Sequence, residues 1–218
     1  MKNIKYGIIG SSGKMGKEII SVMNELGHEL VFKHDVDENW ESGTPKVMID
    51  FSSPSAIEKS LGFATEFESS IIIGTTGFTD EQLKEIKETS KQIAIVQSYN
   101  YSLGIFLLLK CAELLNNSLK DWDVEITETH HRFKKDKPSG TAIMIKNILK
   151  RDVNISSLRL GNIAGEHTVS FGGLGEVLSV SHLATSRRTF AEGVAKAADF
   201  ILDKKKGFYT IQDVFSTN

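Results

Sequence analysis

The segment Ile4-Lys5-Tyr6-Gly7-Ile8-Ile9-Gly10-Ser11-Ser12-Gly13-Lys14-Met15-Gly16 indicates the fold of the first part of the chain. A strand-like apolar run leads into a glycine-rich turn, and a helix is expected from about Lys14. In this context glycines let the backbone approach a pyrophosphate at the helix N-terminus. The spacing is looser than the usual Gly-x-Gly-x-x-Gly, because Ser12 stands at the second glycine, so a plain strand-to-helix turn is the alternative.

Apolar runs and amphipathic stretches alternate through the first hundred residues. After the first strand, further strands are expected at 30–34, 47–51, 71–73 and 93–96, with helices that begin near Ser55 and Thr79. Such alternation indicates βαβ units and a parallel sheet covered by helices.

One link in this series is unusually short. About ten residues separate Asp35 from Val47, whereas a parallel crossover needs a dozen or more. We therefore expect an irregular loop around Gly43 and Pro45, without a covering helix.

The middle of the chain predicts a second, smaller domain. We expect an apolar helix at 102–115, a strand at 124–129 and a helix from Thr141. Strands interrupted by glycines then continue to Leu183. Consecutive strands with few helices favour a mixed or antiparallel sheet. A late helix at 187–202 has apolar residues at helical spacing and could return to the first domain. The predicted fold class is α/β: a Rossmann-like parallel-sheet domain (1–101 and 187–218) plus a smaller α+β domain (102–186).

Charge and composition argue against several classes of function. The 218 residues carry 26 Lys and Arg against 28 Asp and Glu, so no general positive field recruits nucleic acid or anionic lipid. The longest apolar run, 103–109, is far shorter than the roughly 20 residues of a membrane span. The N-terminus passes into a strand too soon for a signal peptide, so we expect no export. Cys111 is the sole cysteine, which fits a reducing compartment, and its apolar surroundings predict a buried structural thiol.

Asp35 ends the strand that follows the glycine-rich turn. A carboxylate at this place can accept hydrogen bonds from an adenosine ribose, and a solvated strand-end carboxylate is the alternative. Lys33 and His34 precede it and could balance a 2′-phosphate. The residues alone therefore leave NADH and NADPH open.

Two further turns follow predicted strands, Asp50-Phe51-Ser52-Ser53-Pro54 and Gly74-Thr75-Thr76-Gly77. Both should lie at the carboxyl edge of the sheet, where ligands of such folds bind. Their glycines and small hydroxyl residues could line the nicotinamide half of a cofactor site. Turn chemistry alone explains many such clusters, so each turn by itself is weak evidence.

The stretch from Glu128 to Ala142 predicts an anion site between a strand and a helix. Its residues 130–137 contain two histidines and four cations, in a chain whose net charge is negative. Ser139-Gly140-Thr141 begins a helix whose unpaired amides would hold a carboxylate. Lys134 could bind a second anionic group, and either histidine could deliver a proton because its ordinary pKa is near neutral.

Two alternatives apply to this stretch. A metal pair at His130 and His131 is disfavoured, because adjacent strand positions point to opposite faces and no third ligand is apparent nearby. A solvated surface loop would explain the lysines if Ser139-Gly140-Thr141 were absent.

These residues resemble the dihydrodipicolinate reductase family. Its signature Glu-x-His-His-x-x-Lys-x-Asp-x-Pro-Ser-Gly-Thr-Ala is matched at Glu128, His130, His131, Lys134, Asp136 and Pro138 to Ala142. The resemblance extends along nearly the whole chain, through Gly10 to Gly16, Asp50-Phe51, Gly74 to Gly77, Asn100-Tyr101-Ser102, Gly165-Glu166-His167, Arg187, Phe190-Ala191, Gly207-Phe208-Tyr209 and Asp213-Val214.

The resemblance implies an NAD(P)H-dependent oxidoreductase of lysine and diaminopimelate biosynthesis. It would reduce a dihydrodipicolinate-type cyclic imine dicarboxylate to tetrahydrodipicolinate, with hydride from NADH or NADPH. His130 would be the general acid and Lys134 would stabilise charge on the substrate. His131 would assist substrate binding with Ser139, Gly140 and Thr141. The implied cofactor-binding residues are Gly10, Ser11, Ser12, Gly13, Lys14, Met15, Gly16, Asp35, Phe51, Gly74, Thr75, Thr76, Ser98, Asn100 and Tyr101.

The resemblance also implies a homotetramer built through the sheet of the second domain, with the late helix returning to the nucleotide domain. From the residues themselves we expect a cytoplasmic protein with no metal, nucleic-acid or membrane partner. Three departures limit the transfer. Ser98-Tyr99-Asn100-Tyr101 stands where many relatives have Ala-Pro-Asn-Phe, and Lys137 replaces the usual alanine before Pro138. The link after Asp35 and the segment 150–158 are shorter than in longer relatives, so cofactor preference does not transfer.

Two rival functions fit parts of the pattern. Another two-domain Rossmann reductase, acting on an amino-acid or sugar carbonyl, would share the glycines and strand-end turns. A non-catalytic nucleotide-sensing module would use the second domain to bind a partner. Turnover of any substrate excludes the module, whereas cofactor binding without activity on the cyclic dicarboxylate favours the other reductase.

Overall fold

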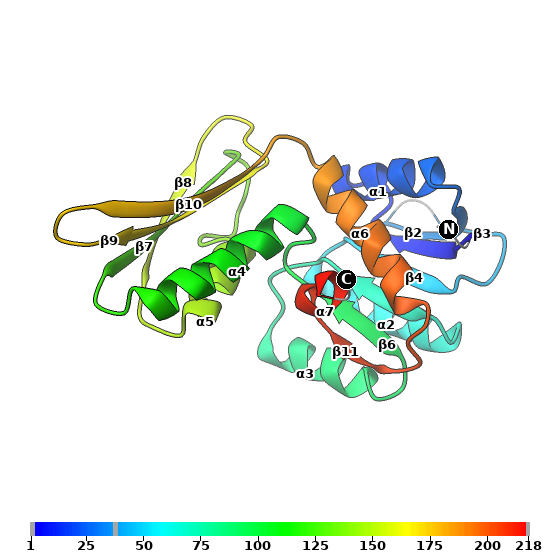
Figure 1. Cartoon of the computed structure of the whole chain (residues 1–218). Helices are drawn as coiled ribbons and strands as arrows, with labels where there is room; N and C mark the ends of the chain where they lie inside the picture. The colour runs from blue at the N-terminus through cyan, green and yellow to red at the C-terminus, as the bar shows by residue number, and fades with distance from the viewer. Residues whose placement is uncertain (1–2, 37–38, 217–218) are drawn as a thin grey trace. The chain divides into compact units, whose positions relative to one another are not determined.

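The computed structural model describes residues 3–36 and 39–216, and the chain divides into two compact units (Figure 1). The first unit comprises residues 1–101 and 188–218, and the second comprises residues 102–187. Each unit has its own sheet, one of seven strands and one of four. The predicted fold class, a Rossmann-like parallel sheet with a second, smaller sheet domain, is confirmed.

The first sheet has the strand order β11-β6-β5-β4-β1-β2-β3, and only the β2–β3 pair is antiparallel. Its strands are β1 (Lys5–Ile9), β2 (Glu29–His34), β3 (Asn39–Glu41), β4 (Val47–Asp50), β5 (Ser70–Ile73), β6 (Ala94–Gln97) and β11 (Gly207–Tyr209). β5 is almost wholly apolar because a parallel sheet is buried on both faces. The carboxyl ends of β1, β4, β5 and β6 therefore meet at one edge.

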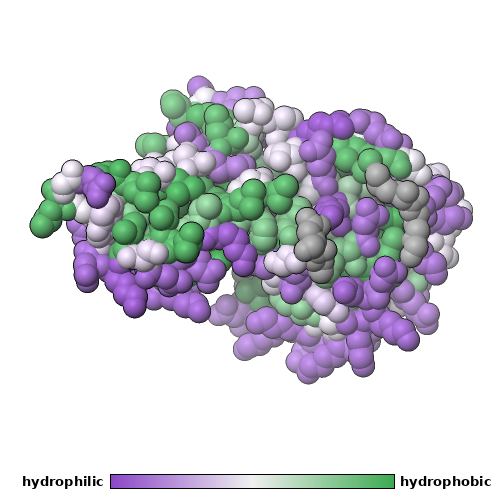
Figure 2. All heavy atoms as spheres, in the orientation of Figure 1, coloured by the Kyte–Doolittle hydropathy of each residue, from purple (hydrophilic) through white to green (hydrophobic). Residues whose placement is uncertain are grey.

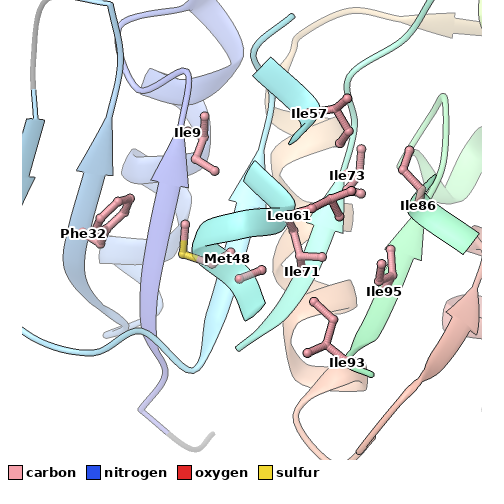
Figure 3. Close-up of a cluster of buried hydrophobic side chains, with 11 residues drawn as sticks. Ile9, Phe32, Met48, Ile57, Leu61, Ile71, Ile73, Ile86, Ile93 and Ile95 are labelled. Atoms are coloured by element: carbon pink, nitrogen blue, oxygen red, sulfur yellow. The ribbon is translucent and has the colours of Figure 1, made fainter. Parts of the chain in front are cut away.

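Helices cover both faces of this sheet. They are α1 (Lys14–Glu25), α2 (Ile57–Glu66, preceded by the 3-10 turn Pro54–Ala56), α3 (Asp80–Thr89), α6 (Arg188–Ile201) and α7 (Ile211–Phe215). α2 packs beside α3, and α1 packs beside α6. Figure 3 shows Leu61 of α2 and Ile86 of α3 over Met48, Ile71 and Ile95 of the strands, all in one buried apolar cluster.

The short link after β2 holds a strand in addition to the expected irregular loop. β3 pairs with β2, with Trp40 opposite Lys33, and no helix occurs in the described part of the link, residues 35–36 and 39–46. The other part of this link, 37–38, lies outside the described residues. β11, which pairs with β6, was also not predicted. Three-residue strands are too short to show a period, which is why the sequence did not reveal them.

The second sheet has the order β10-β9-β7-β8, with β7 parallel to β8 and antiparallel to β9. The elements are α4 (Leu103–Ser118), β7 (Asp123–His130), α5 (Gly140–Leu149), β8 (Asn154–Arg159), β9 (Gly165–Gly172) and β10 (Val177–Ala184). α4 and α5 pack together and bury Ile126, Val169 and Phe171 in a second core. The other face has no covering helix among the described residues.

That open face mixes hydroxyl and apolar side chains. Thr168 and Ser181 are hydrogen-bonded across β9 and β10, and so are Ser170 and Ser179. Leu158 and Leu183 are more than half exposed. Figure 2 shows hydrophobic surface gathered over the second unit.

The prediction that Cys111 is buried was wrong, because the thiol is exposed on α4. The buried positions of this helix include Ile105, Leu108 and Ala112, and Cys111 lies on the outward side. Its apolar neighbour Leu107 is also exposed, so the apolar run concealed the helical period. No described helix is both long and apolar enough to cross a membrane.

Gly193 of α6 allows this late helix to pack closely within the first unit. A Cβ at position 193 would lie 1.6 Å from the carbonyl oxygen of Tyr101, whereas a Cβ at Gly62 of α2 would meet nothing within 4 Å. We expect Gly193→Ala to destabilise by about 1–3 kcal/mol through overpacking. The control Gly62→Ala should stabilise by up to about 1 kcal/mol, because alanine favours a helix interior. Urea unfolding midpoints test this, and equal midpoints for the two variants would contradict the packing.

Candidate active site

The glycine-rich turn follows β1 and opens α1, as the sequence indicated. Gly10 has a φ of 84°, and a Cβ there would lie 2.5 Å from the carbonyl oxygen of Phe51. A Cβ at Gly16 would lie 2.1 Å from the carbonyl oxygen of Gly10. The turn thus needs glycine at both places for its own closure, and it brings the first-turn amides of α1, which have no intrahelical acceptor, to the carboxyl edge of the sheet.

Asp35 connects the end of β2 to this turn. Its carboxylate accepts hydrogen bonds from the amide of Ser12 at 2.8 Å and from the hydroxyl of Ser12 at 2.7 Å. These bonds, with one from the Val36 amide, lower the pKa of the carboxyl below its ordinary value. Asp35 therefore stays ionised and holds Ser12 beside the turn.

The turns after β4 and β5 are joined through Asp50, which is fully buried. Asp50 Oδ1 accepts hydrogen bonds from the hydroxyls of Ser52 and Thr75. Gly74 lies against the ring of Phe51, since a Cβ there would be 2.1 Å from that ring. Thr76 is half-buried beside them. Asp50 thus fixes two predicted cofactor-binding turns side by side.

The segment after β6 is less open than the prediction of a binding loop suggested. Ser98 Oγ donates to the carbonyl of Asn100, and both residues are buried. Tyr101 is 1% exposed, and its hydroxyl hydrogen-bonds to the carbonyls of Ile73 and Val96. The Tyr101 side chain therefore belongs to the interior of the first unit, which leaves the backbone of this segment as the surface that a ligand could meet.

This edge fits a dinucleotide. Two buried polar atoms, Ser11 Oγ and Asp50 Oδ2, have no hydrogen-bond partner among the described residues. A hollow of about 360 Å³ lies at β2 and β3, and its lining includes Lys33, His34 and the aromatic ring of Trp40. Polar groups at the turns and an aromatic hollow with cations match the phosphates and the adenosine of such a ligand.

In the second unit, the sheet register gathers a buried polar cluster at the end of β7. Glu128 pairs with His167 of β9 on one side, and His130 pairs with Arg159 of β8 on the other. Glu128 is 0% exposed and His130 is 7% exposed. The carboxylate of Glu128 is hydrogen-bonded to Nδ1 of His130, which orients the imidazole and leaves Nε2 for another partner.

The charge state of this pair follows from its surroundings. Burial opposes ionisation of Glu128, but hydrogen bonds from Arg159, Ser157 and His130 leave its pKa below the ordinary value. Burial lowers the pKa of His130, and Glu128 acts against that shift. Lys134 and Arg159, the other charged groups near His130, also lower its pKa. The imidazole is therefore neutral at rest and gains a proton most readily when an anion is bound.

A helix begins at Ser139-Gly140-Thr141, as predicted, and it is α5. Ser139 is the N-cap, and its hydroxyl accepts from the amide of Ala142 at 3.2 Å. The same hydroxyl lies 3.2 Å from Nε2 of His167, whose ring packs edge-on against His130. Burial lowers the pKa of His167 to about 3, so the ring that is hydrogen-bonded to Ser139 is neutral. Gly140 and Thr141 follow, with the amides of the first helical turn.

Lys134 and His131 belong to the loop between β7 and α5. Lys134 Nζ lies 2.9 Å from Asp136 of the same loop, and the lysine side chain is 21% exposed. His131 is half-buried, and its ring centroid is 6.3 Å from that of Phe133. Lys134 is thus held by a neighbouring carboxylate and still reaches solvent, where a ligand can meet it.

A third potential metal ligand does lie near His130, contrary to the sequence argument. Atoms of Glu128, His130 and His167 lie within 4.8 Å of one another. Arg159 nevertheless donates to both oxygens of Glu128, and a cation among the three would stand beside this guanidinium. The cluster is better described as an ion pair that orients a histidine.

Sequence reasoning assigned no role to Glu128, His167, Arg159 or Asp50. Glu128 and His167 stood in the stretches that carried the family resemblance, but their pairing depends on the β7–β9 register. Arg159 is a lone arginine at a strand end, which gives no signal of its own. Alternation along β7 placed Glu128 on the face of His130, and that was the one available clue.

Comparison with known proteins identifies the family of the chain. Residues 27–101 match the family model described as dihydrodipicolinate reductase, N-terminus, and residues 104–215 match dihydrodipicolinate reductase, C-terminus. A 4-hydroxy-tetrahydrodipicolinate reductase of Thermosipho africanus is 49% identical over 211 residues, covering 97% of each chain. One of Methanococcus aeolicus is 37% identical, covering 99% of each. The solved dipicolinate-bound dihydrodipicolinate reductase from Paenisporosarcina sp. TG-14 has a TM-score of 0.78 at 24% identity, covering 98% of this chain and 100% of that one.

The buried neutral His167 predicts a loss of stability in acid. Its pKa is about 3 in the folded protein and near the ordinary 6.5 when unfolded, so the unfolded chain binds the extra proton first as the pH falls. The contribution of His167 is fully present above about pH 6.5 and declines below it, by up to about 1.4 kcal/mol per pH unit. We expect His167→Gln to flatten the fall of the melting temperature between neutral pH and pH 5. A fall as steep as in the wild type would show that His167 titrates normally.

Proposed function

Since the chain belongs to the dihydrodipicolinate reductase family, we propose that it is a 4-hydroxy-tetrahydrodipicolinate reductase of lysine and diaminopimelate biosynthesis. It is an oxidoreductase that uses a nicotinamide cofactor to reduce a cyclic imine dicarboxylate to tetrahydrodipicolinate. The observation that carries this proposal is the oriented His130 between the N-terminus of α5 and Lys134. An anion site with an adjacent proton donor suits a dicarboxylate that gains a hydride and a proton.

The second unit binds the substrate. The first-turn amides of α5, at Gly140 and Thr141, hold one carboxylate, with Ser139 capping the same turn. Lys134 neutralises the charge of the ligand from the preceding loop, and His131 of that loop assists. A bound dianion favours the imidazolium form of His130, because opposite charges raise the pKa of the ring. His130 then donates the proton from Nε2, while Glu128 holds Nδ1.

The first unit binds the dinucleotide at the edge described above. When bound, the reduced nicotinamide supplies the hydride. The amides of the 10–16 turn hold the pyrophosphate, and Asp35 accepts hydrogen bonds from a ribose of NADH. Lys33 and Lys59 line the hollow at β2 and could balance the 2′-phosphate of NADPH, so we propose that both cofactors are used.

We further propose a cytoplasmic homotetramer assembled through the open face of the second sheet. Leu158, Leu183 and Val177 expose apolar surface on or beside that face, and hydroxyl pairs line its centre. A second copy would cover both. Light scattering on the purified protein gives the number of chains directly.

The test of function is oxidation of reduced nicotinamide, followed by absorbance. The substrate is generated in the cuvette by dihydrodipicolinate synthase from pyruvate and aspartate semialdehyde. We expect synthase-dependent oxidation of NADH, NADPH or both, and their ratio ranks the cofactors. No oxidation with either, despite synthase turnover and folded protein, would overturn the proposal and favour another Rossmann reductase.

Substitutions at the oriented histidine and the loop lysine test the mechanism. His130→Ala should lower kcat by roughly 10²-fold or more while dinucleotide affinity is preserved, because the general acid is lost. Lys134→Ala should lower kcat/KM by roughly tenfold or more through loss of a charged hydrogen bond. Steady-state kinetics measure both, with Lys135→Ala, an exposed neighbour, as the control. A normal kcat in His130→Ala would refute the role of the acid, and an unchanged kcat/KM in Lys134→Ala would show that its charge is not used.

A further inference from the structure

Arg159 connects the two functional parts of the second unit without standing in the family signature. It is the last residue of β8, opposite His130 in the register, and its side chain is 14% exposed. Its guanidinium donates to both oxygens of Glu128 at 3.0 and 3.1 Å. It also donates to the backbone carbonyls of Lys134 and Asp136. One side chain thus binds the partner of the acid and the loop of the lysine.

The contact with Glu128 meets a strong physical requirement. A fully buried carboxylate is costly unless a cation and several hydrogen bonds compensate it. Without the guanidinium, Glu128 would take up a proton, and it would then be a poorer partner for His130 Nδ1. The planar fork of arginine matches a carboxylate in two places at once, and an ammonium group does not.

The contacts with the loop set the position of Lys134. Two carbonyls of a segment that lacks a helix or strand are fixed to the end of β8 by the same guanidinium. The same two residues, Lys134 and Asp136, also form an ion pair through their side chains. A loop fixed at two backbone points presents its lysine in one place, which lowers the entropy lost on binding.

We propose that Arg159 is a positioning residue of this site, which aligns the acid His130 through Glu128 and the anion-binding Lys134 through its loop. This inference deepens the proposed function and rests on it. The guanidinium of Arg159 donates its hydrogen bonds to protein groups, so its role differs from that of a residue that contacts the substrate.

The chain offers a matched control in Arg151. Its guanidinium also donates to two backbone carbonyls, those of Lys120 and Trp122, and is also partly buried. These carbonyls precede the first residue of β7, Asp123, whereas Arg159 lies opposite the last, His130. Arg151→Lys therefore imitates the loss of a forked contact without touching the Glu128 network.

The experiment compares Arg159→Lys with Arg151→Lys in the coupled assay. We expect Arg159→Lys to lower kcat by roughly 10- to 100-fold, since small misplacements of catalytic groups have effects of this size. The KM for the dinucleotide, which binds to the other unit, should not change. Arg151→Lys should keep the wild-type kcat. An equal effect of both substitutions, or none at Arg159, would overturn the inference.

Two further measurements separate positioning from folding and from the proposed reaction. Millimolar guanidinium should restore part of the kcat of Arg159→Ala and none of any loss in Arg151→Ala. If the wild type does not turn over the cyclic imine, the proposed function fails, and calorimetric binding of dipicolinate then decides the inference alone. We expect Arg159→Lys to weaken that binding at least about fivefold, as for a displaced charged contact, with Arg151→Lys unaffected. Equal affinities would contradict the role of Arg159.

Discussion

The second unit depends on the burial of one carboxylate. Glu128 lies near the end of β7 with no solvent exposure, and such a group is stable only when its charge is compensated and its oxygens are hydrogen-bonded. Arg159 compensates this charge from β8, and His130, on β7 like Glu128, forms another hydrogen bond. The arrangement fixes which nitrogen of the imidazole is bonded to Glu128. A structural need of the core thereby determines the orientation of His130, the proposed acid.

The two units present helix N-termini, which suit anions, in the same way. In the first, a parallel sheet brings strand ends to one edge, where the turn Gly10–Gly16 presents the amides of α1. In the second, Ser139 caps α5 and presents the amides of that helix. The backbone donors of these two turns do not titrate, whereas the buried histidines His130 and His167 do, and burial lowers the pKa of both.

Much of the fold and of the candidate site could be predicted because the sequence patterns that indicate them are local. The period of the strands, the glycine-rich turn and the run from Glu128 to Ala142 each indicate an element and its chemistry within a short window. The features that the sequence did not predict, or predicted wrongly, depend on contacts between distant residues or on a weak hydrophobic periodicity. β3 and β11 are three residues long, Cys111 lay in a helix apolar on more than one side, and the link from Arg159 to Glu128 exists because β8 lies beside β7. The sequence thus indicated the residues that we propose bind ligands, but not the residues that position them.

The orientation of His130 is the most direct test of this account. Nitrogen NMR of ring-labelled histidine, assigned with a His130→Gln variant and recorded above neutral pH, reports which nitrogen carries the proton. The structure predicts that Nδ1 is protonated and bonded to Glu128, that Nε2 is bare, and that Glu128→Gln removes this preference. A proton on Nε2 in the wild type, or the same spectrum in Glu128→Gln, would show that Glu128 does not orient the acid.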